Sequence, residues 1–271
     1  MKKSLLLLLC LLLLPSICWG LGPFLNLGGS WTPANPTGSG VRPAHWFKAD
    51  GGTNCQFTTG ASVYALADGD VVGWATQYGT VAISGVSNPT TANKPILRTN
   101  VKNGKPVWRF NSTANILQSG VIATLAQPFT VFAVAAEDAT QIADGAYRLI
   151  LSSFLGTNDM EVGKSNGNNF YMYGGTALSD GAMNANWTIW TTVFNGLSSG
   201  MYLSGVLAIS GQAGAANIQC ITIGGYKTGS FLFKGDIAEI LIYPGALSTA
   251  DKNQVGQYLS KKYAITYTNI P

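Results

Sequence analysis

Short runs of β-branched and aromatic residues alternate with clusters of glycine and asparagine along most of this chain. From Val41 onward the runs recur about every ten residues, a spacing typical of an all-β sandwich or barrel. We expect strands over residues 44–48, 71–75, 106–110, 129–136, 148–154, 169–173, 188–194, 201–204, 219–223 and 231–243.

The run at residues 231–243 carries apolar side chains at both odd and even positions. A strand with two apolar faces is covered on both sides, so we expect it near the centre of a sheet. Glu239 is the acidic residue in its second half, and regular alternation puts its side chain on the face of Ile237 and Leu241.

One helix is expected, at the C-terminus. Ser248 and Asp251 form an S-x-x-D capping box at its start. Lys261 and Lys262 fall in its last turn, where they oppose the helix dipole. At helical spacing, one apolar stripe is formed by Val255, Tyr258, Leu259 and Tyr263. We expect this helix to pack on the rim of the sandwich.

The first twenty residues resemble an export signal. Lys2 and Lys3 precede an apolar run at residues 4–14, which is shorter than the roughly 20 residues that span a bilayer. We expect cleavage after Gly20; a retained anchor and acylation at Cys18 are the alternatives. The mature chain is then secreted, cell-surface or periplasmic, with no membrane segment.

Residues 21–40 are rich in Gly and Pro and read as a leader, which leaves residues 41–271 as one domain. After cleavage two cysteines remain, Cys55 and Cys220, in an oxidising compartment. We expect them to form a disulfide; two separate buried thiols are the alternative. A cysteine metal site is excluded because the chain has no C-x-x-C pair and one histidine.

Only 10 % of the 271 residues are charged, against about 25 % in an average domain. The net charge of +4 falls to +2 when Lys2 and Lys3 are removed with the signal. This balance offers no basic surface to bind phosphates, so we expect no nucleic-acid partner.

Several motifs, in order, resemble a laminin-G-like domain of the concanavalin A-like lectin and glucanase superfamily. They are WFKADG at 46–51, DG at 68–69, KP at 94–95, NGKPVWRF at 103–110, residues 187–196 and 201–205, IGGY at 223–226 and GDIAEILIY at 235–243. The resemblance implies a jelly roll of two antiparallel sheets with the first and last strands adjacent. It implies no reaction, because lectins, hydrolases, lyases and adhesive modules share this fold.

Glycan hydrolysis needs two carboxylates about 5 to 10 Å apart. The Glu-x-Asp-x-x-Glu pattern of related glucanases is absent. Asp159 and Glu161 would share a strand face, but Thr157, Asn158 and Gly163 favour a turn, so we expect a solvated loop that contributes to a glycan or cation site at most.

Asp236 and Glu239 are an odd number of residues apart, so a regular strand places them on opposite faces. Without a bulge they cannot act as a pair. We expect Glu239 to be a structural carboxylate that holds loop amides or a cation such as Arg109.

A binding surface has more support in the sequence. Sugars stack their C–H faces on aromatic rings, and amide or carboxylate groups bind their hydroxyls. Tyr171 and Tyr173 share one strand face, opposite Phe170 and Met172. The candidate ligand residues are Asn158, Asp159, Asn169, Tyr171, Tyr173, Asp180 and Trp187. Calcium is an accessory cation that the superfamily allows, although no contiguous calcium loop is present.

We therefore expect an exported, non-catalytic jelly-roll module that binds extracellular carbohydrate or a cell-surface ligand. Two alternatives stay open. One is a glycoside hydrolase or polysaccharide lyase of the same superfamily, and the other is a structural or adhesive component of a surface or virion assembly.

Overall fold

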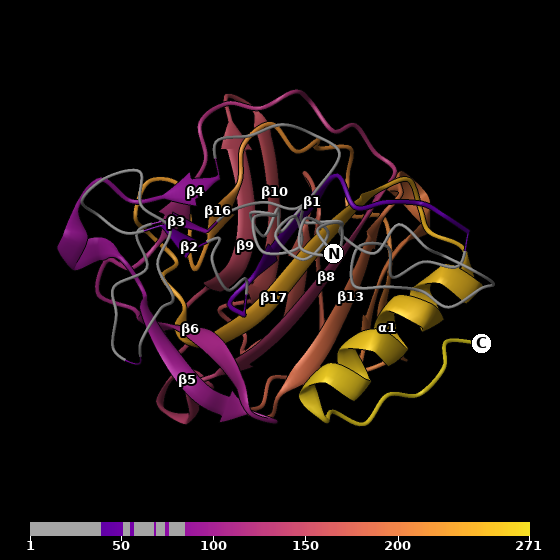
Figure 1. Cartoon of the computed structure of the whole chain (residues 1–271). Coiled ribbons are helices and arrows are strands. Elements are labelled where there is room, and N and C mark those ends of the chain that lie inside the picture. The colour runs from indigo at the N-terminus through magenta and orange to yellow at the C-terminus, as the bar shows by residue number, and fades with distance from the viewer. Residues whose placement is uncertain (1–38, 51–54, 57–67, 69–73, 76–84) are drawn as a thin grey trace, which may run out of the picture.

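Two antiparallel sheets stack face to face in the structure, a computed structural model that describes residues 39–50, 55–56, 68, 74–75 and 85–271 (Figure 1). The eight-stranded sheet runs in the order β15 (Val206–Gly211), β14 (Ser199–Leu203), β13 (Thr188–Phe194), β8 (Phe129–Glu137), β17 (Lys234–Pro244), β6 (Lys105–Asn111) and β5 (Ile96–Lys102), with β1 (His45–Lys48) paired to β17. The first and last strands are therefore neighbours, as the sequence predicts.

The nine-stranded sheet forms the other layer. Its order is β12 (Ala177–Ala182), β11 (Asn169–Tyr173), β10 (Asn158–Lys164), β9 (Arg148–Leu155), β16 (Thr222–Ile223), β7 (Leu117–Gln118), β4 (Val86–Ser87), β3 (Trp74–Ala75) and β2 (Cys55–Gln56). Three short 3₁₀ turns, η2 (Thr91–Asn93), η3 (Ala139–Gln141) and η4 (Gly196–Ser198), join strands. The predicted all-β, two-sheet jelly-roll sandwich with one C-terminal helix is confirmed.

The main core lies between the two sheets, where alternate side chains of each strand meet. Val131 of β8 and Ile240 of β17 face Val162 of β10 and Met172 of β11 across this core. Full burial of such side chains, each about 1.5 to 3 kcal/mol, is the main force that holds the layers together.

Helix α1 (Thr249–Tyr263) begins as predicted, because the Ser248 side chain accepts a hydrogen bond from the Asp251 amide. Its apolar stripe does not close the rim. Val255 and Leu259 instead pack with Phe132, Ile189 and other side chains on the outer face of the eight-stranded sheet. Figure 1 shows α1 lying along this sheet beside β13, so both faces of the sheet are covered by apolar contacts.

A β-bulge corrects the predicted alternation in β17. The register with β8 shifts between Ile237 and Glu239, so Ile237 packs in the main core while Ala238 and Leu241 pack on the helix side. Glu239 therefore shares the helix side with Leu241 but not with Ile237. Because of the same bulge, Asp236 and Glu239 lie on one face rather than on opposite faces.

Several strands do not appear among those we expected. They are β5, β10, β12, β15 and the two-residue strands β2, β4 and β7. In β10 and β12 the outward positions are polar, and β12 is largely exposed, so their sequence has little apolar alternation. Residues 71–73 of one expected strand lie outside the described residues.

The expected disulfide is not formed. Cys220 is a free, buried thiol whose Sγ lies 3.1 Å from the carbonyl oxygen of Phe154. Cys220 lies two residues before β16, and β16 is four strands away from β2, which carries Cys55. Strands are about 4.8 Å apart, so the separation is about 19 Å, whereas a disulfide needs Cα atoms within about 7 Å.

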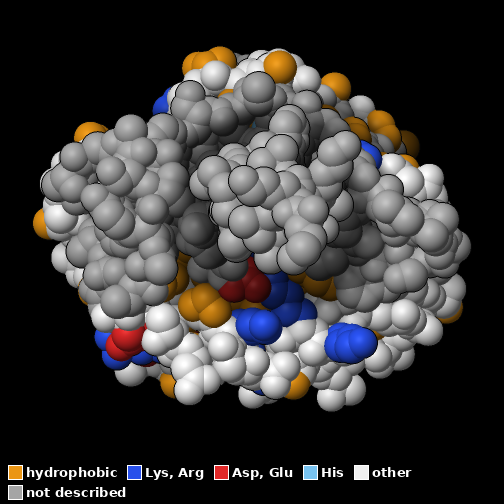
Figure 2. Space-filling view, viewed as in Figure 1, with side chains coloured by type: hydrophobic (Ala, Val, Ile, Leu, Met, Phe, Trp, Pro, Cys, Tyr) orange, Lys and Arg blue, Asp and Glu red, His pale blue; other side chains and the backbone are white. Residues whose placement is uncertain are grey.

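The expected signal peptide at residues 1–20 and most of the leader at 21–40 lie outside the described residues. Within the described part of the chain, no helix is long and apolar enough to cross a membrane. On the face shown in Figure 2, each acidic group among the coloured residues lies against a lysine or arginine, so that view holds no acidic patch.

Candidate ligand-binding face

The outer face of the nine-stranded sheet carries two carboxyl groups on one strand. In β10, Met160 and Val162 point into the main core, so Asp159 and Glu161 point outward between them. Two residues of a strand rise about 7 Å, which sets the spacing of the two side chains. The expected solvated loop at this position is therefore wrong: the backbone pairs with strands on both sides.

Tyrosines flank the two acids on the next strand. Phe170 and Met172 of β11 pack in the core, and Tyr171 and Tyr173 point outward, as the alternation predicts. Glu161 lies directly opposite Tyr173 in the strand register. The two tyrosine rings are stacked with their centroids 6.5 Å apart, so they form a continuous aromatic surface beside the acids.

Four more rings come from β9 and from the segments around it. Tyr147 contacts both Tyr171 and Phe231, with centroids 5.2 and 5.3 Å apart. Tyr226 contacts Phe231 at 5.6 Å and Phe154 at 5.0 Å. The chain of contacts runs around the acids, and we call the whole set the ring-walled acid pair. Its members are Asp159, Glu161, Tyr147, Phe154, Tyr171, Tyr173, Tyr226 and Phe231.

The two acids differ in their hydrogen bonds. The Tyr226 hydroxyl donates to Asp159 Oδ2 at 2.9 Å, whereas Asp159 Oδ1 is buried and has no hydrogen-bond partner among the described residues. Glu161, which is 5 % exposed, interacts with the Tyr171 hydroxyl. An unpaired buried acceptor is costly, so Asp159 Oδ1 favours a hydrogen-bond donor from a bound ligand.

Burial changes the acidity of both groups. Desolvation, together with the neighbouring charge of Asp159, raises the pKa of Glu161 to about 7. Desolvation also raises the pKa of Asp159, while the Tyr226 hydrogen bond opposes this shift. Desolvation by burial, together with the neighbouring acids, raises the pKa values of Tyr171 and Tyr226, so both keep their hydroxyl protons as donors. Near neutral pH the pair therefore gives up or takes up a proton readily.

Phe231 holds an unusual backbone conformation at the edge of this face. Its φ angle is +51°, a region that bulky side chains rarely adopt, and its side chain is 38 % exposed. The Phe231 carbonyl accepts a hydrogen bond from the Leu149 amide at 3.0 Å, which ties the segment to β9. Strained positions of this kind cluster at functional sites.

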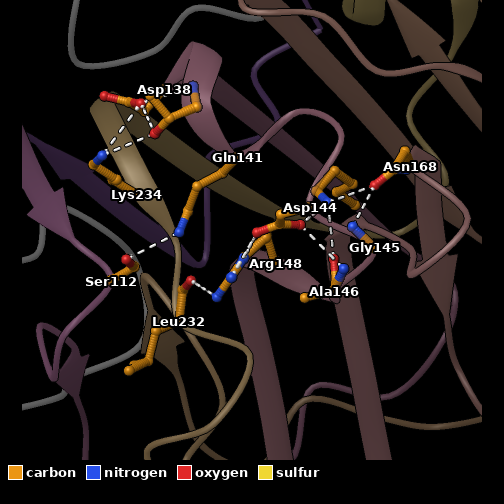
Figure 3. Close-up of polar contacts among 12 residues, drawn as sticks. Ser112, Asp138, Gln141, Asp144, Gly145, Ala146, Arg148, Asn168, Leu232 and Lys234 are labelled. Atoms are coloured by element: carbon orange, nitrogen blue, oxygen red, sulfur yellow. Dashed lines mark hydrogen bonds and ion pairs between the residues drawn. The ribbon is translucent and has the colours of Figure 1, made fainter.

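The basic groups nearest to this face are committed elsewhere (Figure 3). Arg148 donates to Asp144 Oδ2 and to the Leu232 carbonyl, and Lys164 donates to Asp144 Oδ1 at 2.7 Å. Lys164 also binds Asn168 Oδ1, and its side chain is fully buried. Neither cation is therefore available to neutralise the acid pair.

A separate buried carboxyl lies inside the sandwich near Lys164. Glu137 continues the inward-facing positions of β8, and both its oxygens are buried with no hydrogen-bond partner among the described residues. Desolvation raises its pKa to about 8, with Lys164 opposing the shift. It faces the core rather than the ring-walled acid pair.

The structure brings together only part of the expected ligand set. Asp159, Tyr171 and Tyr173 belong to the ring-walled acid pair. Asn169 lies at the start of β11, on the same face by alternation. Asn158 precedes Asp159 and points the other way, where it donates to Gln219 Oε1 at 3.0 Å.

Asp180 and Trp187 lie away from this face. Asp180 is opposite Phe170 in the register and so shares the core-facing side of the sheet, exposed at its edge. Trp187 packs with the helix-side cluster of the other sheet and lines a cavity of about 630 Å³ with Asn184 and Asn186. Asp180 is separated from the site because it points to the other side of the same sheet, and Trp187 because the chain passes to the other sheet after β12.

Four aromatic members of the site, Tyr147, Phe154, Tyr226 and Phe231, were not among our candidates. Tyr147 directly precedes β9 and Phe154 lies in it, next to β10 in the chain, whereas Tyr226 and Phe231 come from the segment after β16, far from β10 and β11 in sequence. No local signal marks them, since each stands in a short aromatic or glycine-containing run like many others in the chain.

Glu239 lies under α1, fully buried, and accepts four hydrogen bonds. The donors are Trp46 Nε1 at 2.6 Å, Tyr258 at 3.0 Å, Tyr263 at 2.8 Å and Lys262 Nζ at 2.6 Å. The cation is thus Lys262 and not Arg109, which forms a two-point ion pair with Asp236. The bulge in β17 explains this, because it aims Glu239 at the helix.

A metal site does not emerge from the described residues, where no group of three His, Cys, Asp or Glu side chains is placed to hold an ion. Calcium stays a prediction.

No family model matches the chain, and no curated protein matches it. Among solved structures, it is similar to the binding domain of botulinum neurotoxin serotype D, with 13 % identity over 65 % of this chain and a TM-score of 0.48. The chain spans about half of that structure, 48 %.

Two further solved structures are similar. Domain 4 of a GH43 extracellular arabinanase from Geobacillus stearothermophilus, in complex with arabinotriose, has 14 % identity over 80 % of this chain and 98 % of that one, with a TM-score of 0.46. Trypanosoma rangeli sialidase in complex with the inhibitor DANA has 14 % identity over 79 % and 37 %, with a TM-score of 0.45. The function is argued below from this chain's own residues.

Proposed function

We propose that the protein is an exported, laminin-G-like β-sandwich module that binds extracellular carbohydrate at the ring-walled acid pair. The observation that carries the proposal is the arrangement itself: six aromatic rings in mutual contact around two carboxyl groups on one outer sheet face. Rings supply flat apolar area to a sugar, and the carboxyl and phenol groups supply directed hydrogen bonds.

The test is binding to a glycan panel by the mature chain, with and without calcium. We expect Tyr226→Ala and Phe231→Ala to weaken binding at least about tenfold, because each removes ring area and Tyr226 also orients Asp159. Leu197→Ala is a matched control, since it removes an exposed apolar side chain (76 % exposed) elsewhere on the surface.

Trp187→Ala tests the cavity beside Trp187 as an alternative ligand site. If it abolishes binding while the Tyr226 and Phe231 variants bind normally, the ligand site is the cavity beside Trp187 and the proposal is wrong. Absence of binding to any glycan in the panel would equally count against it.

Glycan hydrolysis is a second candidate, favoured by one observation. A carboxyl with a pKa of about 7 stands about 7 Å along the strand from another carboxyl, within the range of hydrolase acid pairs. New reducing ends released by the wild type but not by Glu161→Gln would establish hydrolysis at this site. We rank binding first because Glu161 is only 5 % exposed and interacts with Tyr171, so little of its carboxyl group is open to a substrate.

A further inference from the structure

Nothing among the described residues balances the charge of the ring-walled acid pair. We propose that this site selects carbohydrates that carry a protonated amine, the amino sugars, over their neutral N-acetylated forms. The inference rests on the proposed function and narrows its ligand to a cationic class.

The groups that act on the two acids are all neutral or acidic. Asp159 responds to burial and to Tyr226, and Glu161 responds to burial, to Asp159 and to Tyr171. Lys227, which follows Tyr226 in the chain, is not among the groups that shift the pKa of Asp159 or of Glu161. Tyr147 and Tyr173 add two phenol hydroxyl groups to the site and no basic group. A carboxyl pair in such surroundings gains most from a cation that a ligand brings.

The two basic side chains on the flanking strands have other partners. Arg148 binds Asp144 at 2.6 Å (Figure 3), and Lys164 binds the same carboxylate at 2.7 Å. The sequence outside the described residues adds little: residues 51–54, 57–67, 69–73 and 76–84 contain no Lys, Arg or His, and residues 1–38 contain only Lys2 and Lys3. Among the described residues, no ion pair joins a basic side chain to Asp159 or Glu161.

Two buried oxygens on this face are ready to accept a hydrogen bond. One is Asp159 Oδ1, and the other is Thr222 Oγ1, whose residue is 1 % exposed. The register places Thr222 opposite Ser152 and Ser152 opposite Glu161, so all three lie in one row across the outer face. An ammonium group is a three-donor partner for Asp159 Oδ1, whereas Thr222, which lies two strands or about 10 Å from Glu161, is too far away to share the same group. The ammonium group is also attracted to the faces of the surrounding rings.

A cation at this position has a second consequence. It favours the ionised form of Glu161, so binding at mildly acidic pH expels the proton that a pKa of about 7 otherwise retains. An aromatic platform that bound only the sugar ring would release no proton.

The experiment compares the β-1,4-linked glucosamine hexamer with its fully N-acetylated counterpart by titration calorimetry. The pH is mildly acidic, where the amines are protonated, and two buffers of different ionisation enthalpy report the proton release. We expect the amino form to bind about tenfold more tightly or better, with proton release, and the preference to weaken with salt.

The variants Asp159→Asn and Glu161→Gln should lose the preference but keep binding of the N-acetylated form, because the rings remain. Asp180→Asn is the matched control. It removes an exposed carboxylate from β12, on the opposite side of the sheet, and should leave the preference unchanged.

Equal or tighter binding of the N-acetylated hexamer, with loss in Tyr226→Ala, overturns the amine preference and leaves the proposed function standing. The same holds if neither hexamer binds while a neutral glycan of the panel binds at this face. If binding of every glycan is unchanged in the Tyr226 and Phe231 variants, both conclusions are wrong.

Discussion

Three acidic residues differ in the number of donors that reach their carboxyl groups. Glu239 has four hydrogen-bond donors, Asp159 has one, and Glu137 has none among the described residues. A buried carboxylate with donors is stabilised as an anion, whereas one without donors retains its proton. The same residue type is therefore a structural anchor in one place and a titrating group in another.

Glu137→Gln should make the protein more stable above neutral pH. The folded pKa of about 8 exceeds the reference of 4.5, so the native state binds the proton more tightly and stability falls as pH rises between these values. The Gln side chain has no proton to lose, so we expect a gain of about 2 to 4 kcal/mol near pH 8 and little change near pH 5, measured by urea unfolding.

Asp138→Asn should change the pH dependence of stability in the opposite direction to Glu137→Gln. The Thr140 hydrogen bond lowers the pKa of Asp138, so its ionised form contributes stability that is lost on acidification and is absent from the variant. If Glu137→Gln shows the same pH dependence of unfolding as the wild type, the buried, unpartnered state of Glu137 is refuted.

Glu239→Ala should lower the free energy of unfolding by about 3 to 5 kcal/mol, because it removes the acceptor shared by Trp46, Tyr258 and Tyr263 and leaves Lys262 with Asp50 as its one carboxylate partner among the described residues. Asp236→Ala is the control from the same face of the same strand. Its ion pair with Arg109, whose side chain is 46 % exposed, should contribute about 1 kcal/mol or less. Equal losses in chemical denaturation would contradict the anchoring role of Glu239.

At the scale of elements, the pairing of β9 with β10 positions the ligand-binding face. The register between them shifts at Val162 and Gly163, and the backbones approach closely there. A Cβ atom on Gly163 would lie 2.0 Å from the Arg148 carbonyl oxygen and 2.8 Å from Leu149 Cα. Glycine is required at this position because backbone atoms cannot move aside.

Gly163→Ala should therefore destabilise the fold by about 2 kcal/mol or more, since the two strands must separate. It should also weaken ligand binding, because Glu161 lies two residues away on the same strand face. Thermal unfolding and the glycan titration measure the two effects. Gly120→Ala, where no heavy atom lies within 4 Å of the new Cβ, should leave both unchanged. Full stability of Gly163→Ala would show that the strands do not approach so closely.

At the scale of the whole molecule, sheet order decides which distant residues meet. The order places β16, beside Cys220, four strands from β2 and Cys55. We expect Cys220 to be alkylated when the mature chain is unfolded without reductant, and mass spectrometry to find no Cys55–Cys220 linked peptide. Recovery of that linked peptide would contradict the strand order of the nine-stranded sheet.

The sequence by itself determined the fold class, the pairing of the first and last strands and the capped helix. The fold class and the helix follow from local alternation and from the Ser248 capping box, which depend on residues close in the chain. The pairing of the first and last strands was implied by the family resemblance of the motifs read in order. It also placed Tyr171 and Tyr173 on one face, because a period of two survives in any regular strand.

Only the tertiary structure decided what surrounds them. We expected Asp159 and Glu161 in a loop because Thr157, Asn158 and Gly163 favour a turn, and Tyr226 and Phe231 reach them from a segment that no local pattern connects to β10. A single bulge moved Glu239 from one face of β17 to the other. The physical reason is the same in each case. Register and strand order set the distances between residues on different strands, and the alternation of side chains along one strand carries no information about those distances.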